Sequence, residues 1–346
     1  MDTVNIGIIG VNGFGKRHVK TISGMANARV AAVCDVDRTA VEAVGAEFGV
    51  TGRFTDYRDM VALDGLDAVV IAAPHFLHHP MCMAALNAGK HVLCEKPFTT
   101  SPAHARQIVD LAKQSGKVLT VDYNMRLYNE AKVLKQFVES GELGEVYLSK
   151  VIYVERRTGF MFDPNTTWRV QKAKAGGGIF IGRGCHAMDL ILFLLGFPKL
   201  KSMSMTCFNK LAHLEVEDTA VGTLMLENGN VITIETTYVQ HLPLHKVGWN
   251  IELYGTRGGA VYAQWDYKDT TLAVGRCDMA TGQWTDLLAD FRADGAAYPA
   301  SIMDDFVESI RAGRAPFVKP EEAYRVTQLL SAGYESAASG APVPLT

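Results

Sequence analysis

Short apolar segments alternate with longer segments of mixed polarity over the first third of the chain. The apolar segments are rich in branched residues and end at glycine, proline or a polar residue, which is typical of strands buried on both faces of a parallel sheet. These predicted strands cover residues 4–9, 29–34, 68–73, 91–94 and 118–121. Helices are predicted between them at residues 17–25, 38–48, 80–88 and 102–115. We therefore expect residues 1–124 to form a doubly wound α/β domain.

The pattern changes after about residue 124. A helix is predicted at residues 130–140, and long strand-like segments separated by short polar turns then dominate. These strands cover residues 146–155, 201–208, 219–226, 231–239, 250–254 and 260–265, with helices at 186–195, 303–312 and 320–338. Residues 125–346 are therefore predicted to form an α+β domain with a large, mostly antiparallel open sheet. The helices within residues 303–338 are candidates for packing back towards the first domain.

Composition and charge narrow the function classes. The 346 residues suit two domains, and 34 basic against 37 acidic residues leave a net charge of −3, so no attraction to nucleic acid or to an anionic membrane is expected. The longest apolar run, residues 191–197, is far shorter than the ~20 residues of a membrane span, and the amino terminus lacks the basic region of a signal peptide. Six scattered cysteines without a CxxC pair favour a reducing compartment. We expect a cytoplasmic protein.

A glycine-rich turn follows the first predicted strand and contains Gly10, Asn12, Gly13, Phe14 and Gly15. Glycines at a strand-to-helix turn permit positive φ and let backbone N–H groups approach a pyrophosphate. The spacing departs from GxGxxG because Asn12 occupies the second glycine position, and asparagine tolerates left-handed φ better than most residues. The turn predicts a dinucleotide site in a Rossmann domain.

Asp35 stands at the end of the second predicted strand. A carboxylate there is placed to accept hydrogen bonds from the adenosine ribose, and it repels a 2′-phosphate. The sequence therefore favours NAD over NADP.

Further phrases follow in a fixed order along the chain. They are Ile71-Ala72-Ala73-Pro74 with His78, residues 88–97 (AGKHVLCEKP), Asn124 with Arg126, residues 140–144 (SGELG), residues 176–178 (GGG) with His186 and Asp189, residues 310–313 (IRAG) and residues 337–340 (AASG). Because these motifs occur in this order, nearly the whole chain resembles the Gfo/Idh/MocA oxidoreductases, which include glucose-fructose oxidoreductase and inositol dehydrogenase. The resemblance implies a two-domain, NAD(P)-dependent oxidoreductase acting on a sugar, polyol or related hydroxyl compound. It also implies a homo-oligomer, dimer or tetramer, assembled through the outer face of the second domain's sheet.

The resemblance assigns roles to individual residues by position. Lys96 matches the family's catalytic lysine beside the nicotinamide, and Pro97 is expected to follow a cis bond. A lysine at a strand's carboxyl edge can take the proton that a hydroxyl must lose when its carbon gives up hydride. His186 matches the active-site histidine that bonds the substrate hydroxyl or shares its proton, and Glu95 is expected to contact cofactor or to hold the loop. The expected cofactor-binding residues are Gly10, Asn12, Gly13, Phe14, Gly15, Asp35, Ala73, Pro74, His78, Glu95, Lys96 and Asn124.

Two groups of histidines resemble metal sites, and several aromatic and arginine side chains are candidates for substrate binding. His75, His78 and His79 cluster like metal ligands, but Pro80 is expected to push His79 out of helical geometry, and no metal is expected. His241 and His245 are separated by Pro243, which also argues against a metal site. The candidate substrate-binding side chains are Tyr153, Trp168, Arg169 and Arg183, with Arg156 and Arg157 nearby. Inward-pointing arginines would favour a carboxylate or phosphate on the substrate.

Gly182 departs from the family pattern. Most catalytic relatives place an aspartate four residues before the active-site histidine, one helical turn away, whereas this chain has glycine before His186. Two consequences are open. In the first, the space left free admits a substrate bulkier or more anionic than inositol or glucose, and Arg183 or Arg169 binds its negative charge. In the second, the catalytic set of Lys96 and His186 lacks its third residue, the aspartate. The first is the favoured interpretation.

Three other functions compete with a simple dehydrogenase. Relatives of the same fold use a retained NAD to process glycosides without net redox, and others act as non-catalytic sugar- or nucleotide-sensing regulators. The presence of both Lys96 and His186 argues against a regulator. Glyceraldehyde-phosphate dehydrogenase is suggested only by the turn around Gly13, and the chain lacks its reactive cysteine phrase.

Overall fold

The computed structural model describes residues 3–155, 167–210, 214–238, 247–265, 269–289, 291 and 298–345. Its backbone groups into two compact units. The first unit contains Met1–Tyr123 and Pro299–Thr327, and the second contains Asn124–Tyr298 and Gln328–Thr346. The last helix, α11 (Pro320–Ser339), contributes its first part to the first unit and its remainder to the second.

The first unit is built on a six-stranded parallel sheet. Its strands are β1 (Val4–Ile9), β2 (Ala28–Cys34), β3 (Gly52–Phe54), β4 (Ala68–Ile71), β5 (His91–Cys94) and β6 (Leu119–Val121). They pair in the order β3-β2-β1-β4-β5-β6. All four residues of β4 are buried, as expected for a strand covered on both faces. The predicted Rossmann topology is confirmed, and β3 is a short edge strand that the sequence pattern did not predict.

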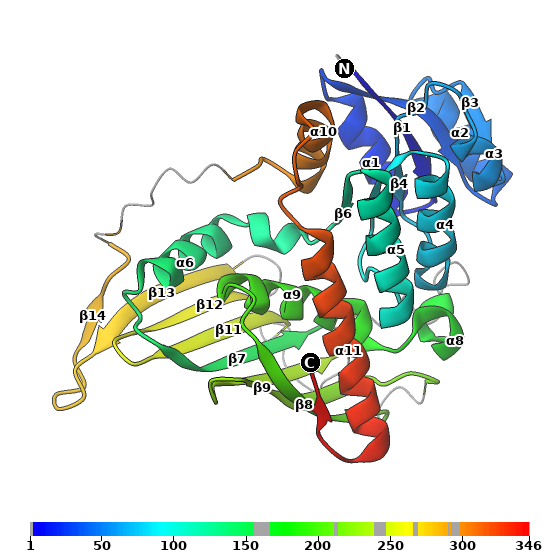
Figure 1. The fold of residues 1–346 in the computed structure, drawn as a ribbon. Helices are drawn as coiled ribbons and strands as arrows, with labels where there is room; N and C mark the ends of the chain where they lie inside the picture. The colour runs from blue at the N-terminus through cyan, green and yellow to red at the C-terminus, as the bar shows by residue number, and fades with distance from the viewer. Residues whose placement is uncertain are drawn as a thin grey trace. The chain divides into compact units, whose positions relative to one another are not determined.

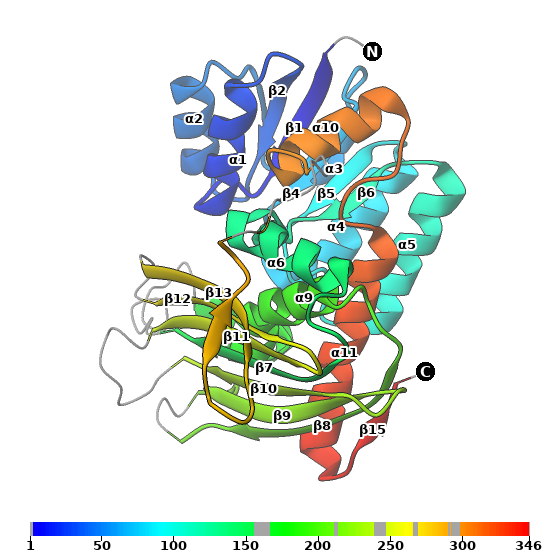
Figure 2. The ribbon, with the colours of Figure 1, turned by 90° about the vertical axis from the view of Figure 1, so that its left-hand side faces the viewer.

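Helices cover both faces of this sheet (Figure 2). They are α1 (Phe14–Ser23), α2 (Arg38–Glu47), α3 (Tyr57–Val61), α4 (His75–Asn87), α5 (Pro102–Ser115) and α10 (Ile302–Ala312). In Figure 2, α1 and α2 lie on one side of the strands, and α4 and α5 lie on the other. The carboxyl ends of the strands therefore meet at one edge, where ligands bind in folds of this class.

Helix α4 corrects one sequence-based expectation. The helix begins at His75 rather than at Pro80, so Pro80 lies inside it and does not displace His79 from helical geometry. The local preference of the residue before proline is overridden because the later turns bury Met81 and Leu86 in the core of the unit.

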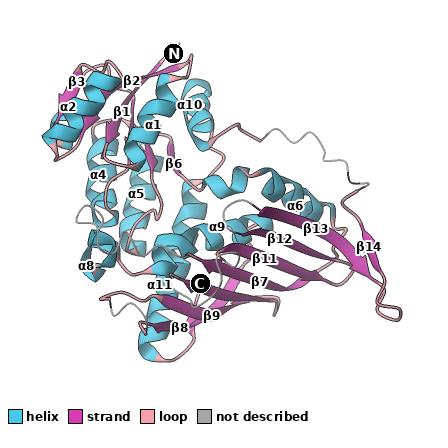
Figure 3. Cartoon of the chain, turned by 180° about the vertical axis from the view of Figure 1, so that it is seen from behind, coloured by secondary structure: helices cyan, strands magenta, loops and turns pink. Residues whose placement is uncertain are grey.

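The second unit contains a nine-stranded mixed sheet (Figure 3). Its strands are β7 (Val146–Val154), β8 (Leu200–Phe208), β9 (Thr219–Leu226), β10 (Val231–Thr237), β11 (Gly248–Gly255), β12 (Gly259–Trp265), β13 (Asp269–Cys277), β14 (Trp284–Asp286) and β15 (Val343–Pro344). Their order is β14-β13-β12-β11-β7-β10-β9-β8-β15, and among the paired strands only β7 and β10 are parallel. The predicted mostly antiparallel sheet is confirmed, although β13, β14 and β15 were not predicted.

One face of this sheet forms the core of the second unit. Register places Ile251, Val151 and Ile234 side by side on that face, and each is at most 1% exposed. Helices α6 (Asn129–Ser140) and α9 (Cys185–Leu194) lie over the same face of the sheet (Figure 1). The opposite, outer face carries side chains of alternate residues, among them Lys150 and Val221.

Among the described residues, Lys172–Leu194 is the stretch long and apolar enough to resemble a membrane span. It contains α8 (Lys172–Ala175), a π-helical turn at Phe180–Gly184 and α9. Since 89% of its most apolar window is buried inside the structure, it is a core segment of the second unit.

Candidate functional site

The glycine turn after β1 has the geometry of an anion cradle. Gly10 and Gly13 have φ of 84° and 83°, and Gly13 immediately precedes α1. A Cβ on Gly10 would lie 2.6 Å from the carbonyl oxygen of Ala72, and one on Gly15 would lie 1.6 Å from that of Gly10. A Cβ on Gly13 would meet no atom within 4 Å, so this glycine faces open space. The turn therefore fits a pyrophosphate at the amino end of α1.

Asn12 adopts a different conformation from the expected one. Among the described residues the positive φ angles of this turn fall on Gly10 and Gly13, so Asn12 does not take the left-handed conformation for which it was considered suited. Its backbone N–H instead donates to Asp35 Oδ2 at 3.3 Å.

Asp35 holds the glycine turn from the end of β2. Its Oδ2 also accepts the backbone N–H of Val11 at 2.9 Å, and its Oδ1 accepts that of Asp37 at 3.1 Å. A carboxylate accepts several hydrogen bonds at once, so these contacts leave acceptor capacity for ribose hydroxyls. The turn and Asp35 together fit the pyrophosphate and ribose of a dinucleotide.

Lys96 lies at the carboxyl edge of the same sheet, two residues after the end of β5. The Lys96–Pro97 peptide bond is cis, as expected from the resemblance. The backbone N–H of Lys96 donates to Glu95 Oε2 at 3.3 Å. Ala73 and Pro74 follow β4, the neighbouring strand, and Pro74 precedes the first residue of α4.

His78 joins the loops that follow β4 and β5. Its side chain is fully buried; Nε2 lies 2.9 Å from the carbonyl oxygen of Ala73, and Nδ1 lies 2.9 Å and 3.2 Å from those of Pro97 and Phe98. Burial lowers the pKa of this imidazole. His78 thus fixes the loop that carries Lys96, and its contact with a cofactor stays a prediction.

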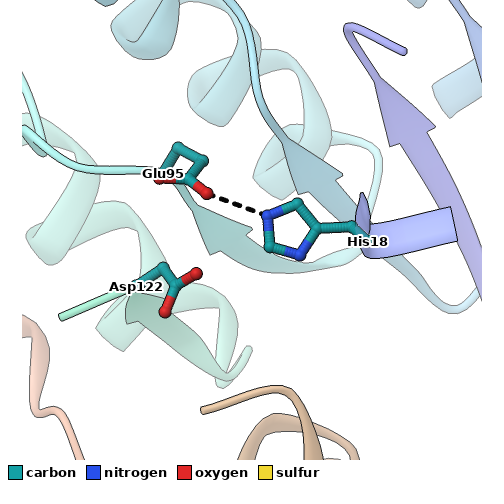
Figure 4. Close-up of side chains that lie close together, drawn as sticks. All are labelled: His18, Glu95 and Asp122. Atoms are coloured by element: carbon teal, nitrogen blue, oxygen red, sulfur yellow. Dashed lines mark hydrogen bonds and ion pairs between the residues drawn. The ribbon is translucent and has the colours of Figure 1, made fainter. Parts of the chain in front are cut away.

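The side chains of His18, Glu95 and Asp122 form a cluster of three titratable groups (Figure 4), and Lys96 follows Glu95 in the chain. His18 of α1 donates from Nε2 to Glu95 Oε1 at 2.9 Å, and both side chains are only 12–13% exposed. The register pairs Cys94 with Val121, so the next residue on each strand, Glu95 and Asp122, also lies at the same sheet edge. The ligand atoms of His18, Glu95 and Asp122 all lie within 4.8 Å of one another. Glu95 therefore links α1 to the Lys96 loop.

The charges of this cluster act on one another. Burial lowers the pKa of His18, but the hydrogen bond and charge of Glu95 outweigh burial and raise it. Burial alone would raise the pKa of Glu95, yet His18, and then Lys96 and His78, hold it below its usual value. Burial and the neighbouring charge of Glu95 raise the pKa of Asp122 to about 7. His18 and Asp122 were not predicted from the sequence, because neither residue lies in a motif on which the family resemblance rests.

The histidines of α4 make separate local contacts. His79 stacks on His104 with ring centroids 4.0 Å apart, and its Nε2 bonds Gln107 Oε1 at 2.8 Å. His75 and His78 rings are 5.9 Å apart and tilted. In the described part of the chain, the three side chains close enough to share an ion are those of His18, Glu95 and Asp122.

In the second unit, His186 occupies the first turn of α9 and is 8% exposed. The preceding π-helical turn is anchored by the buried carboxylate of Glu217. Its Oε2 accepts the N–H of Gly178 at 2.8 Å, and its Oε1 accepts the N–H of Phe180 at 3.0 Å and the hydroxyl of Tyr334 at 2.7 Å. Burial raises the pKa of Glu217 despite these donors. Glu217 was not predicted from the sequence.

The space beside Gly182 is occupied. A Cβ built on Gly182 would lie 2.8 Å from the hydroxyl oxygen of Tyr238, a residue that is 4% exposed. Burial, and then the charge of Glu155, raises the pKa of that hydroxyl. The expectation that the glycine leaves free space is therefore wrong at this position, because a tyrosine from the end of β10 fills it.

Arg183 is paired with a buried carboxylate. Its Nε and Nη2 donate to Glu155 at 2.7 Å and 3.1 Å, and Glu155 is 1% exposed. Burial alone would lower the pKa of Arg183, but Glu155 raises it. The charge of Arg183 is already neutralised within the fold, which weakens the case for an anionic substrate at this residue.

The other side chains of the second unit that were predicted to bind substrate make separate local contacts. Tyr153 stacks on Trp249 with centroids 6.2 Å apart, and Arg169 lies 4.5 Å from the ring of Trp168. Asn124 begins a short 3₁₀ helix, Asn124–Leu127. Arg156, Arg157, His241, Pro243 and His245 fall outside the described residues.

Comparison with known proteins identifies both parts of the chain. Residues 4–123 match the oxidoreductase family with an NAD-binding Rossmann fold, and residues 135–345 match the C-terminal alpha/beta domain of the same family. D-glucoside 3-dehydrogenase of Escherichia coli is 29% identical over 91% of this chain and 89% of its own length. Inositol 2-dehydrogenase 1 of Saccharopolyspora erythraea is 28% identical over 99% and 96%.

A solved structure of an NAD-binding protein from Listeria innocua has the same fold. It superposes with a TM-score of 0.83 at 28% identity and covers 99% of this chain and 97% of its own. With the glycine cradle, the Glu-Lys-Pro loop and both family domains in place, the chain belongs to the Gfo/Idh/MocA family of oxidoreductases and carries that family's NAD-binding domain.

Proposed function

We propose that this protein is an NAD-dependent oxidoreductase that transfers hydride between nicotinamide and a secondary hydroxyl or ketone of a cyclic sugar, polyol or sugar derivative. The observation that carries the proposal is the position of Lys96 at the carboxyl edge of the sheet whose glycine turn fits a dinucleotide. The names of the E. coli and S. erythraea relatives support a glucoside-like or inositol-like substrate.

Lys96 carries the proton chemistry in this proposal. NAD, when bound, supplies the hydride acceptor. The amine of Lys96 takes the proton of the substrate hydroxyl while its carbon loses hydride, and His186 stays a predicted substrate-binding residue of the second unit. His78 and Glu95 keep the Lys96 loop in place through their backbone contacts. The anchoring of the π-helical turn by Glu217 orients the start of α9 and with it His186.

A substrate panel tests the proposal directly. Purified protein with NAD is given cyclic polyols, aldoses, sugar acids and cyclic dihydrodiols, and NADH formation is followed by absorbance. The expected result is one NADH formed for each molecule of oxidised product. Consumption of a glycoside without net NADH would point instead to processing with a retained cofactor. Binding of sugar and NADH without turnover would point to a regulator.

NAD preference is expected to rest on Asp35. Replacing Asp35 with serine removes the charge that repels a 2′-phosphate, so kcat/KM with NADP should rise relative to that with NAD. The comparison uses both cofactors with wild type and variant. Asp37→Ser, which removes a neighbouring negative charge, keeps a side-chain oxygen that can cap α2 and leaves Asp35 in place, is the matched control. A wild type that already prefers NADP would overturn the role of Asp35.

Gly182→Asp is expected to lower the stability of the protein. The new side chain collides with the Tyr238 hydroxyl, and overpacking of this kind costs about 1–3 kcal/mol. Tyr238→Phe removes the colliding oxygen, so the double variant should regain part of the lost Tm. Thermal unfolding and KM of the four proteins complete the cycle. A gain of activity in Gly182→Asp would show that the glycine is a defect.

Assembly through the outer face of the nine-stranded sheet is part of the proposal. In the described residues this face exposes Val221, Met225 and Val261 by 44%, 38% and 37%. Val221 and Met225 lie on the same strand, and exposed apolar side chains on an open sheet face support an interface there. Val221→Asp should therefore shift the protein towards monomer in size-exclusion chromatography with light scattering. Met279→Asp, on an exposed turn away from the sheet face, should not. An unchanged elution of Val221→Asp would rule out this face.

A further inference from the structure

The exposed apolar side chains of the first unit lie at one edge of its sheet. Among the described residues of this unit, the large hydrophobic side chains that stay exposed are those of Phe14, Val36 and Phe76, by 42%, 90% and 40%. Phe14 begins α1 after β1, Val36 stands two residues after β2, and Phe76 lies in the first turn of α4 after β4. All three follow the carboxyl end of a strand, as the glycine turn does. Ligand sites are lined by apolar and aromatic side chains of this kind, so this edge suits the rings of a dinucleotide.

The guanidinium of Arg17 lies over the ring of Phe14. Residues three apart on a helix share a face, and helical side chains tilt towards the amino end, so Arg17 reaches back to the first residue of α1. Its Cζ atom lies 4.7 Å from the centroid of the Phe14 ring, which is a cation–π distance. The ring thus holds an exposed positive charge near the amino end of α1.

The amino end of α1 is short of negative charge. Arg17 makes no ion pair with a carboxylate of the described residues, whereas Nζ of the neighbouring Lys16 lies 2.7 Å from Glu47 Oε2. The first turn of α1 has no acidic residue, and its N-cap, Gly13, provides no side-chain cap. Backbone N–H groups, the positive end of the helix dipole and one arginine therefore meet at the turn that fits a pyrophosphate.

We propose that Arg17 binds the pyrophosphate of NAD(H), and that the ring of Phe14 holds the guanidinium in the position for this contact. The inference rests on the NAD site of the proposed function and adds to it a residue that no motif of the sequence indicated. The glycine turn offers backbone N–H groups but carries no charged side chain, whereas the pyrophosphate is an anion. A guanidinium binds phosphate oxygens through parallel N–H donors, so Arg17 supplies the charge that the turn lacks.

Binding of three ligands to the cofactor-free protein tests the inference without catalysis. NADH and ADP-ribose contain the pyrophosphate, whereas adenosine does not. Arg17→Met should raise the dissociation constants of NADH and ADP-ribose by about 10-fold, the lower end of the range for a hydrogen bond to a charged group, because Arg17 is exposed. The dissociation constant of adenosine should stay unchanged. Isothermal titration calorimetry measures NADH and ADP-ribose, and adenosine is measured by displacement of fluorescent NADH.

Two further variants separate this contact from general electrostatics. Lys16→Met removes the same charge one residue away, from a side chain already paired with Glu47, so it should change the NADH dissociation constant by less than about twofold. Arg17→Lys keeps the charge but loses the planar fork, so it should recover only part of the affinity. The affinity of the wild type for NADH should also fall more steeply with added salt than that of Arg17→Met, because the variant lacks one ion pair.

A double-variant cycle tests the part that Phe14 plays. Phe14→Leu keeps an apolar residue at the start of α1 but removes the ring beneath the guanidinium. Because the ring holds Arg17 in place, the loss of NADH affinity caused by Arg17→Met should be smaller in the Phe14→Leu background than in the wild type. Equal losses in both backgrounds would overturn this part of the proposal.

Three results would overturn the role of Arg17. They are unchanged binding of NADH by Arg17→Met, a loss of adenosine affinity as large as that of NADH, and a loss in Lys16→Met as large as that in Arg17→Met. Because both side chains are exposed, the variants should keep the Tm of the wild type without ligand, which separates lost binding from lost folding. A wild type that binds neither NADH nor ADP-ribose would instead overturn the proposed NAD dependence itself.

Discussion

Replacing Lys96 with methionine is expected to abolish turnover while leaving NADH binding intact. Methionine has a similar length but carries no proton-accepting amine, so the variant loses the group that takes the hydroxyl proton. Loss of a general base lowers kcat by roughly 10²–10⁴-fold. The glycine turn and Asp35 lie elsewhere on the sheet edge and are unchanged, so the cofactor site should persist.

The measurement pairs steady-state kinetics with NADH fluorescence titration. Lys113→Met, an exposed lysine in the last turn of α5, is the matched control and should behave as wild type. A Lys96→Met variant with near-normal kcat would remove this residue from the chemistry and favour the regulator. A variant that no longer binds NADH would show that Lys96 supports the cofactor site instead.

The largest loss of stability is expected from Arg126→Met. The guanidinium of Arg126 donates to Asp189 through Nε at 2.8 Å and Nη2 at 2.6 Å, and both side chains are 1% exposed. Removing one partner of a buried pair leaves an uncompensated charge in the core and costs about 3–5 kcal/mol. Because Asp189 lies on α9, one turn after His186, the same change should loosen the helix that carries the histidine.

Urea unfolding of the single and double variants measures this effect. Arg126→Met combined with Asp189→Leu replaces the pair by apolar side chains, so most of the lost stability should return. Arg276→Met, which breaks an exposed pair with Glu142, should cost less than about 1 kcal/mol. A single variant as stable as this control would show that the buried pair does not stabilise the second unit.

Most of the architecture could be predicted from the sequence because its strands are short and apolar throughout. Segments such as β4 have no polar position that would be consistent with an exposed face, so the parallel sheet follows. The three residues of β3 and the five of α3 are too few to show a period. The predicted helix starts at Pro80, whereas α4 starts at His75, because burial of the later turns outweighs the local preference of the residue before proline.

The candidate site could be predicted only where its residues belong to a motif that is continuous in the sequence. Lys96 and the glycine turn lie in phrases that can be recognised along the chain. His18 meets Glu95, and Asp122 comes beside it, through the packing of α1 and the register of β5 with β6, which no local pattern encodes. Tyr238 fills the space beside Gly182 because β10 ends there, so the sequence alone suggested an empty position that the fold occupies.

The first unit is completed by a segment that is translated long after its main part. Pro299–Thr327 belongs to it, and this segment supplies the fully buried Phe306 and Val307, a carboxylate that accepts from Asn27 at 2.6 Å, and the carbonyl of Val318 that accepts from Thr120 at 3.0 Å. About 200 residues separate Tyr123 from Thr327, which a ribosome takes roughly 10–40 s to translate. During that interval the six-stranded sheet lacks part of its apolar cover. The main part of the first unit is therefore translated before the second unit, yet it stays incomplete until most of the second unit has been made, and it is exposed to chaperones and proteases throughout that interval.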